Sequence, residues 1–126
     1  MIRVAVAILY KGNKILACRR KRGSRYELQW EFPGGKLEHN ESGEDCVRRE
    51  LFEELNITID IPVLLETKKV FYDDGGWFEV SYFLVRDFSG KLNNTVFEQI
   101  RWVTLEELKQ LDILEGNKSF IERLTI

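Results

Sequence analysis

Residues 35–57 read GKLEHNESGEDCVRRELFEELNI, and the helix that they predict decides how the rest of the chain is interpreted. Ser42 and Asp45 form a capping-box pattern at the start of this helix. Three aliphatic residues then recur every four positions, as on the buried face of a helix: Val47, Leu51 and Leu55. No other segment of the chain predicts a helix as strongly.

The same helix carries three glutamates at spacings of three and four residues: Glu50, Glu53 and Glu54. On a helical wheel they form an arc beside the buried stripe, where neighbouring like charges destabilise by roughly 0.2–0.5 kcal/mol per pair. A solvated acidic face is the ordinary interpretation of such a run. Here, however, no lysines alternate with the acidic residues at the helical spacing, and a glycine-rich loop lies shortly before the helix. We therefore predict that a hard divalent cation, Mg²⁺ with Mn²⁺ as an alternative, offsets the repulsion.

The segments on either side of this helix predict mostly strands. Residues 1–20 form a predicted hairpin around KGNK, and LQWEFPGGKLE (28–38) predicts a strand, a sharp loop and a second strand. Further strands are expected at about 58–72 and 77–87, around the turn DDGG, and at 100–104. Two short helices follow, the first capped within TLEEL and the second after Asn117. This order predicts an α+β fold with a mixed sheet.

Length and composition predict one domain over residues 1–126, since 126 residues with 44% hydrophobic content can form a single core. The chain has no apolar run of about 18 residues, so we expect a cytoplasmic protein without a membrane partner. The net charge of −2 provides no basic surface for a nucleic-acid polymer. A polyanionic ligand would therefore need a local cation. Cys18 and Cys46 fit no zinc or disulfide pattern and are expected to be buried.

Residues 35–57 resemble the Nudix box, the pattern G-x5-E-x7-R-E-U-x-E-E-x-G-U in which U is a bulky aliphatic residue. Eight positions fit: Gly35, Glu41, Arg49, Glu50, Leu51, Glu53, Glu54 and Ile57. One position departs, because Asn56 replaces the last glycine of the pattern. Asn also adopts the left-handed conformation at helix ends, so we expect the geometry to be retained. The resemblance implies the Nudix fold, a mixed β-sheet sandwiched between α-helices.

The flanking segments WEFPGGKLE and EQIRWVTLEEL are similar to the MutT-type branch of the Nudix hydrolases. The resemblance implies Mg²⁺-dependent hydrolysis of a nucleoside triphosphate to monophosphate and pyrophosphate, with 8-oxo-dGTP as the expected substrate in nucleotide-pool sanitation. Within the enzyme class, the alternatives are a cytosine-nucleotide pyrophosphohydrolase and a sugar-nucleotide hydrolase. Outside it, the alternative is a Nudix module that senses a nucleotide without cleaving it, and the intact box argues against that alternative.

The box positions imply a metal site and a residue that arranges it. The implied ligands are Glu50, Glu53 and Glu54, with the carbonyl of Gly35 nearby. Arg49, counted among the catalytic residues, should orient these carboxylates and Glu41 by ion pairing.

Glu98 lies in a loop before a predicted strand, where related enzymes often supply a further carboxylate. It is therefore a candidate metal ligand or general base, although a simple surface glutamate fits equally well. The general base is Glu50 or Glu98, because a carboxylate beside an activated water can accept its proton.

Six residues are candidate substrate contacts: Arg20, Phe32, Pro33, Lys36, Phe78 and Asn117. Lys36 follows the double glycine and Arg20 ends a strand in a basic cluster, so both are candidate phosphate contacts or else solvated strand ends. The aromatic residues and Pro33 are candidates for the base pocket, although aromatic residues in strands are more often core.

Asn117 matches the asparagine with which the MutT enzyme for oxidised guanine nucleotides reads the base. Its amide suits the guanine edge, because it offers one acceptor and two donors. The alternative is structural, since asparagine is also a favoured N-cap and a helix is predicted to begin here. His39, the only histidine, is expected on the surface.

Overall fold

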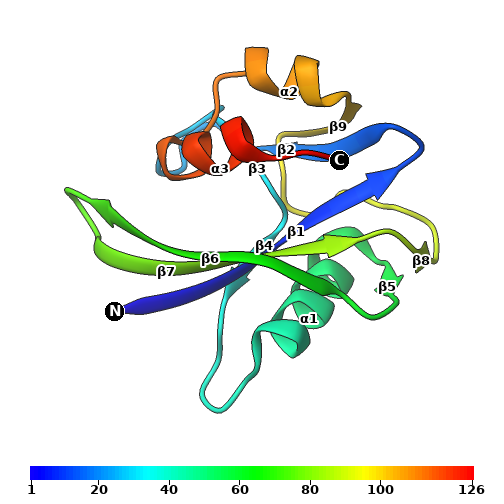
Figure 1. Cartoon of the computed structure of the whole chain (residues 1–126), viewed down its shortest axis with the longest axis horizontal. Helices are drawn as coiled ribbons and strands as arrows, with labels where there is room; N and C mark the ends of the chain where they lie inside the picture. Colours follow the sequence, from blue (N-terminus) through cyan, green and yellow to red (C-terminus); the bar gives the residue numbers. More distant parts are fainter.

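A seven-stranded mixed sheet forms the centre of the protein, and the computed structural model describes all residues from 1 to 126 (Figure 1). In chain order the strands are β1 (Ile2–Lys11), β2 (Lys14–Arg19), β3 (Trp30–Glu31), β4 (Gly34–Lys36), β5 (Thr58–Ile59), β6 (Val63–Tyr72), β7 (Gly76–Val85), β8 (Phe88–Ser89) and β9 (Gln99–Val103). The order across the sheet is β3-β2-β1-β7-β6, with β4 paired to β1 and β9 paired to β2. β1 and β7 run parallel among antiparallel neighbours, so the sheet is mixed as predicted.

Helices cover both faces of this sheet (Figure 1). They are α1 (Gly43–Leu55), α2 (Leu105–Gln110), the 3₁₀ turn η1 (Glu115–Asn117) and α3 (Lys118–Arg123). α1 lies on one face, and α2 and α3 lie on the other. Consequently β1 is buried without alternation from Ala5 to Leu9, because both sides of the strand face a core. The predicted fold, a mixed sheet between helices, is confirmed.

The caps of α1 agree with the sequence pattern. The Ser42 hydroxyl accepts a hydrogen bond from the N–H of Asp45 at 3.1 Å, which satisfies one of the free amides of the first turn. Asn56 ends the helix in the left-handed conformation, with φ 59° and ψ 34°, and its N–H donates to the carbonyl of Phe52. The predicted stripe is buried in the core beneath the sheet: Val47, Leu51 and Leu55. α1 therefore begins and ends where the sequence predicted.

The strand predicted at 58–72 is wrong as a single element. β5 ends at Ile59 and β6 starts at Val63, and Pro62 stands between them without an N–H to donate to a sheet. β5 instead pairs with β8 in a separate two-stranded sheet. The predicted hairpin is confirmed, because residues 73–75 form the turn from β6 to β7, although β7 ends at Val85 rather than at 87.

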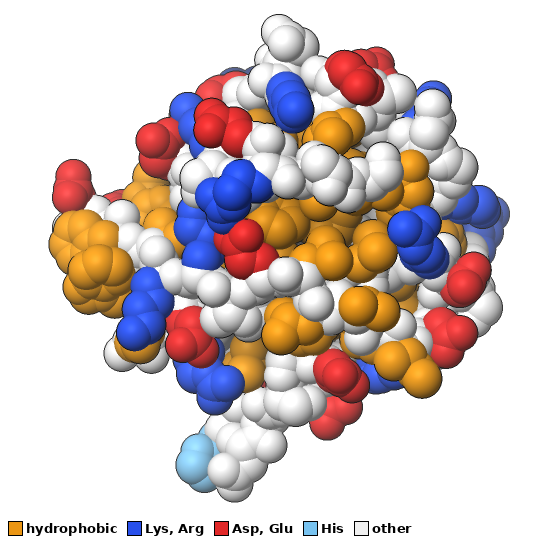
Figure 2. Space-filling view, viewed as in Figure 1, with side chains coloured by type: hydrophobic (Ala, Val, Ile, Leu, Met, Phe, Trp, Pro, Cys, Tyr) orange, Lys and Arg blue, Asp and Glu red, His pale blue; other side chains and the backbone are white.

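Two predictions about single residue types also hold. Cys18 and Cys46 are free and buried. His39 is exposed on the loop before α1, where Figure 2 shows the one histidine at a protruding tip. None of the helices has the length and apolar character needed to cross a membrane.

Candidate active site

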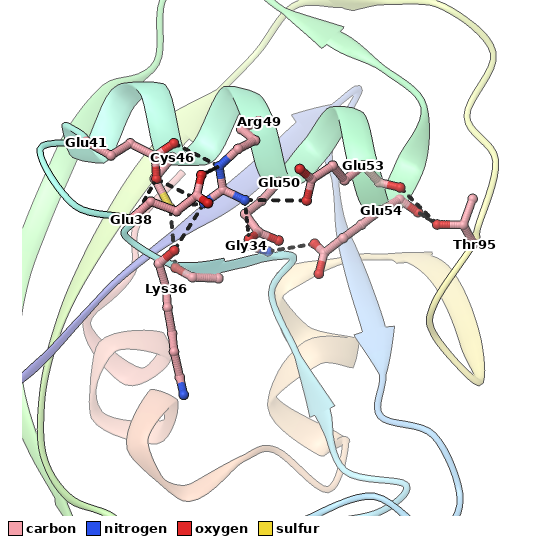
Figure 3. Close-up of polar contacts among 11 residues, drawn as sticks. Gly34, Lys36, Glu38, Glu41, Cys46, Arg49, Glu50, Glu53, Glu54 and Thr95 are labelled. Carbon is pink, nitrogen blue, oxygen red and sulfur yellow. Dashed lines mark hydrogen bonds and ion pairs between the residues drawn. The ribbon is translucent and has the colours of Figure 1, made fainter.

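The acidic arc of α1, formed by Glu50, Glu53 and Glu54, lies next to β4, on the side of the helix beside its buried stripe (Figure 3). Their environments differ, because the side chain of Glu50 is 16% exposed whereas that of Glu53 is 56% exposed. Glu54 is intermediate, and its carboxylate accepts a hydrogen bond from the N–H of Gly34 at 3.0 Å. The glycine-rich loop and the acidic arc are thus in direct contact, as the predicted site requires.

Gly35 gives Glu50 the space that its carboxylate occupies. A Cβ added at Gly35 would lie 2.5 Å from the carboxyl carbon of Glu50, closer than any ordinary contact. The carbonyl of Gly35, which the resemblance placed near the metal, accepts a hydrogen bond from the Cys46 thiol at 3.4 Å. A side chain at this position would therefore displace one of the predicted ligands.

Arg49 holds four acidic side chains (Figure 3). Its guanidinium makes two hydrogen bonds to Glu41, at 2.8 and 2.9 Å, and single contacts to the remaining three, Glu38 (3.0 Å), Glu50 (2.9 Å) and Glu53 (3.4 Å). It also donates to the carbonyl of Lys36 at 3.1 Å. The hydrogen bonds from Arg49 lower the pKa of Glu41 to about 2. These contacts agree with the predicted role of Arg49 toward Glu41, Glu50 and Glu53, whereas Glu54 is held by the N–H of Gly34 and not by Arg49.

The charge of this site is not fully compensated. Burial, followed by the neighbouring Glu50 carboxylate, raises the pKa of Glu54 to about 8. Burial also raises the pKa of Glu50, although Arg49 acts in the opposite direction. A cation beside these two side chains would relieve both desolvation and repulsion.

The donor set fits a hard divalent cation in chemical type, because such cations prefer carboxylate and carbonyl oxygens. The side chains do not converge as a ready-made metal cluster, however, and no group of three acidic, cysteine or histidine residues is close enough to hold an ion. Glu50 and Glu53 turn toward Arg49, and Glu54 turns toward Gly34. Binding of a cation would therefore require Glu50 and Glu53 to exchange Arg49 for the metal.

A cleft of about 420 Å³ extends from this acidic site across the sheet to η1. At one end it is lined by Gly34, Gly35, Lys36 and Glu54, and at the other by Phe32, Tyr72, Phe78, Leu114 and Asn117. The cleft therefore connects residues predicted to handle phosphates with residues predicted to handle a base. A more open hollow of about 590 Å³, around Met1 and Trp77, contains none of the predicted site residues.

The two predicted phosphate contacts both line the cleft but differ in their partners. The Nη1 of Arg20 lies 3.2 and 3.1 Å from the two carboxylate oxygens of Glu31, so much of its charge is already compensated. Lys36 is exposed, its ammonium has no partner in the protein, and its side chain points away from Arg49 (Figure 3). Lys36 is the more available cation.

Asn117 lies at the opposite end of the cleft and is only 7% exposed. α3 begins directly after Asn117, as the alternative predicted, but the Asn117 side chain makes no capping hydrogen bond to the backbone of the helix. Instead its Oδ1 accepts a hydrogen bond from the hydroxyl of Tyr82 at 2.7 Å. This tertiary contact removes the side chain from the position that a cap would need.

Of the three residues predicted for the base pocket besides Asn117, two line the cleft and one does not. Phe32 and Phe78 line it, and Phe32 is also core, at 3% exposure. Pro33 is buried beside the cleft without lining it, and its carbonyl accepts from the N–H of Ala7. Its predicted place in the base pocket is therefore not borne out by the lining of the cleft.

Glu98 is exposed and makes no hydrogen bond or ion pair with the residues of the acidic site. Its carboxylate accepts from the N–H of Arg22 at 3.2 Å and does not line the cleft. The loop that carries it is nevertheless attached to the end of α1, since the Thr95 hydroxyl donates to the carbonyls of Glu53 and Glu54 at 3.0 and 2.9 Å. The role of Glu98 stays a prediction.

The sequence interpretation included neither Glu31 nor Tyr82 among the candidate site residues. Glu31 is a cleft residue whose pKa is raised by burial, against the lowering effect of Arg20. Its position between two apolar aromatic residues, Trp30 and Phe32, was the available signal, because a carboxylate buried there needs a partner. Tyr82 is fully buried.

Comparison with known proteins agrees with this geometry. Residues 1–124 match the family described as NUDIX domain. The chain is 29% identical over 122 residues to an 8-oxo-dGTP diphosphatase of Buchnera aphidicola, covering 96% of this chain and 91% of that protein. It is 32% identical over 124 residues to a CTP pyrophosphohydrolase of Escherichia coli, covering 97% and 90%. The crystal structure of a MutT NUDIX hydrolase from Burkholderia pseudomallei superimposes with a TM-score of 0.88 at 26% identity, over 98% of both chains.

Proposed function

Because this chain belongs to the Nudix family and is a hydrolase, we propose that it cleaves nucleoside triphosphates into a monophosphate and pyrophosphate, with oxidised guanine nucleotides as preferred substrates. The observation that carries the proposal is the single cleft that joins Glu54, Gly35 and Lys36 at one end to the buried amide of Asn117 at the other. Such a cleft can accept a ligand with a charged end and a hydrogen-bonding end.

Glu50, Glu53 and Glu54 would hold a divalent cation, Mg²⁺ in the first instance, with the carbonyl of Gly35 as a further oxygen donor. Nudix hydrolases generally use divalent metals. The bound cation would neutralise phosphate charge and lower the pKa of an attacking water. Arg49 supports this function by holding Glu50 and Glu53 on the same side of α1 until the cation replaces it.

Glu50 is the first choice for the residue that accepts the proton of the attacking water. It is half-buried against Gly35, which lines the cleft, whereas Glu98 lies outside the cleft and is exposed. Glu98 is the alternative, because the loop that carries it is hydrogen-bonded to the end of α1 through Thr95.

Lys36 would contact the phosphates, because it lines the cleft and its ammonium has no partner in the protein. Phe32 and Phe78 would contact the base at the opposite end, where Asn117 offers polar groups for recognition. Guanine specificity is supported by this amide and by the relatives named 8-oxo-dGTP diphosphatase. The CTP pyrophosphohydrolase among the relatives supports the second candidate, hydrolysis of cytosine nucleotides.

The test is a pyrophosphate-release assay with 8-oxo-dGTP, dGTP, dATP and dCTP, each with Mg²⁺ and with a chelator. We expect 8-oxo-dGTP to have the highest kcat/KM and the chelator to abolish turnover. A higher kcat/KM for dCTP would assign the second candidate. Failure to release pyrophosphate from any of these substrates would refute the proposed reaction.

The metal site is tested by Glu53→Gln, with Glu44→Gln as the matched control on the same helix. Loss of a ligand should reduce turnover to less than about a tenth, since charge stabilisation at a phosphoryl centre contributes several kcal/mol. Glu44 is exposed in the first turn of α1, outside the acidic site, so its variant should retain activity. Equal activity of the two variants would contradict the assignment.

A further inference from the structure

Tyr82 combines a fully buried ring with a hydroxyl that contacts Asn117, at the end of the cleft where the base would bind. The ring stacks on Phe120 of α3 at 3.9 Å between centroids and meets Phe32 edge to face at 6.3 Å. These contacts fix the ring between β7 and α3. Burial raises the pKa of the hydroxyl above its usual value, so the proton is retained across the functional pH range.

The hydroxyl uses this proton to bind Asn117. Its O–H lies 2.7 Å from Asn117 Oδ1 and 3.4 Å from the carbonyl of Gly116. A hydroxyl has one proton to donate, and the shorter contact is the stronger bond. If the amide were turned over, its amino group could donate to the hydroxyl oxygen, but the proton of the hydroxyl would then have only the Gly116 carbonyl, at 3.4 Å, as an acceptor. The tyrosine therefore favours one of the two orientations of the amide.

The amino group of Asn117 is left without a protein partner. No hydrogen bond of its Nδ2 is formed within the chain, yet the protein contains no buried side-chain nitrogen or oxygen that lacks a partner. Nδ2 must therefore reach open space, and Asn117 lines the cleft. With Oδ1 turned inward to Tyr82, the amide presents donors to a bound ligand.

We propose that Tyr82 is a positioning residue that locks the amide of Asn117 with its amino group toward the cleft, so that the site reads a hydrogen-bond acceptor on the base. This inference rests on the proposed function and deepens it. Guanine and 8-oxoguanine carry a carbonyl at position 6, whereas adenine carries an amino group there. The locked amino group of Asn117 can donate a hydrogen bond to the carbonyl at position 6 of guanine. With adenine it would face an amino group, which is also a donor, and no hydrogen bond would form. The site therefore rejects adenine nucleotides through an unpaired buried polar group.

A phenylalanine would fill the same core without this effect. The stacking on Phe120 and the contact with Phe32 involve only the ring, so apolar packing does not require the hydroxyl. Tyr72 provides the comparison, because its hydroxyl also reaches η1 but accepts from the N–H of Gly116 and makes no hydrogen bond to Asn117. Two tyrosines thus support the same turn, and only one controls the orientation of the amide.

The test measures kcat/KM for dGTP and dATP with wild type, Tyr82→Phe and Tyr72→Phe. The freed amide of Tyr82→Phe can turn its Oδ1 toward the adenine amino group, so we expect the dGTP to dATP ratio to fall by about tenfold. In Tyr72→Phe the ratio should stay within about threefold of wild type even if both rates fall. A merely structural role of Tyr82 would lower both rates alike, and a change of less than about threefold in its ratio would overturn the inference.

If Tyr82→Phe does not fold, the variant Asn117→Asp tests the inference instead. If wild type shows no turnover, a binding measurement tests it. In Asn117→Asp, Tyr82 would bind one carboxylate oxygen and leave the other as an acceptor, so preference should shift from guanine toward adenine or cytosine. Dissociation constants of dGMP and dAMP, measured by calorimetry, report the same ratio without catalysis. Retained guanine preference in Asn117→Asp would refute the lock, whereas absence of turnover in wild type alone would refute only the proposed reaction.

Discussion

Replacement of Gly35 by alanine should separate activity from stability. The new Cβ would lie 2.5 Å from both the carboxyl carbon and one oxygen of Glu50, where an ordinary carbon contact requires about 3.5 Å. The carboxylate would therefore have to move by about 1 Å. It cannot keep its 2.9 Å contact with Arg49 while it does so, and the predicted metal site is disturbed.

A displacement of this size in a catalytic group costs about 10²-fold in rate, whereas the effect on the folded state is small. The Glu50 side chain can rotate, and alanine in place of glycine stabilises by about 0.4–1 kcal/mol through the unfolded chain. The adjacent Gly34→Ala is the contrast. Gly34 has φ 148°, and an added Cβ would collide with the backbone of β1, 2.6 Å from Val6 Cα. This variant should lose at least about 2 kcal/mol of stability.

The assay combines pyrophosphate release with thermal unfolding followed by circular dichroism. For Gly35→Ala we expect about a hundredfold lower kcat and a melting temperature within a few degrees of wild type. For Gly34→Ala we expect a clear fall in melting temperature. The reasoning is refuted if Gly35→Ala retains more than about a third of the wild-type kcat, or if it melts as early as Gly34→Ala.

Three further predictions concern the metal, the end of α1 and the base. Mg²⁺ at a hundredfold excess over its dissociation constant should stabilise wild type by about 2.7 kcal/mol and so raise its melting temperature. The melting temperature of Glu53→Gln should stay nearly unchanged. An equal shift in both proteins would place the ion elsewhere. Asn56→Gly should be tolerated in activity and stability, whereas Asn56→Val should lose about 1–2 kcal/mol in denaturant unfolding, because φ is 59° at this position. Equal stability of the two variants would be inconsistent with a left-handed terminator. Asn117→Ala should lower kcat/KM for guanine nucleotides about tenfold and change that for dCTP far less. Unchanged selectivity among 8-oxo-dGTP, dGTP and dCTP would remove Asn117 from base recognition.

The parts of the fold that depend on local patterns could be predicted from the sequence. The caps of α1 are formed by residues within four positions of its ends, and its buried stripe follows the helical period. The strand at 58–72 was predicted too long because alternation and β-propensity were given more weight than Pro62. Neither pattern indicates that β5 leaves the main sheet to pair with β8, since that pairing joins segments about 30 residues apart.

In the candidate site, too, contacts within one motif could be predicted, whereas contacts between distant segments could not. Arg49, Glu41, Glu50 and Glu53 lie within one motif, so the resemblance predicted their contacts, although it predicted neither the contact of Arg49 with Glu38 nor the absence of one with Glu54. For Asn117, an asparagine directly before a predicted helix is expected both of a helix cap and of a side chain that reads the base, so the sequence could not distinguish the two roles. Only the hydrogen bond from Tyr82, a residue 35 positions away, excludes the cap. The Arg20–Glu31 pair was missed for a similar reason, because it depends on how β2 and β3 pair.

The two apolar layers on either side of β1 have an evolutionary consequence. α1 packs into the layer beneath the sheet, whereas Tyr82 and Phe120, which support Asn117, pack into the layer above it. Substitutions that are far apart and share no partners act nearly additively. If the proposed function holds, mutations around η1 and α3 would therefore change which base is preferred while the hydrolytic machinery on α1 is inherited intact. This independence makes substrate choice a trait that duplicated genes can vary early, and one that directed evolution can select separately from turnover.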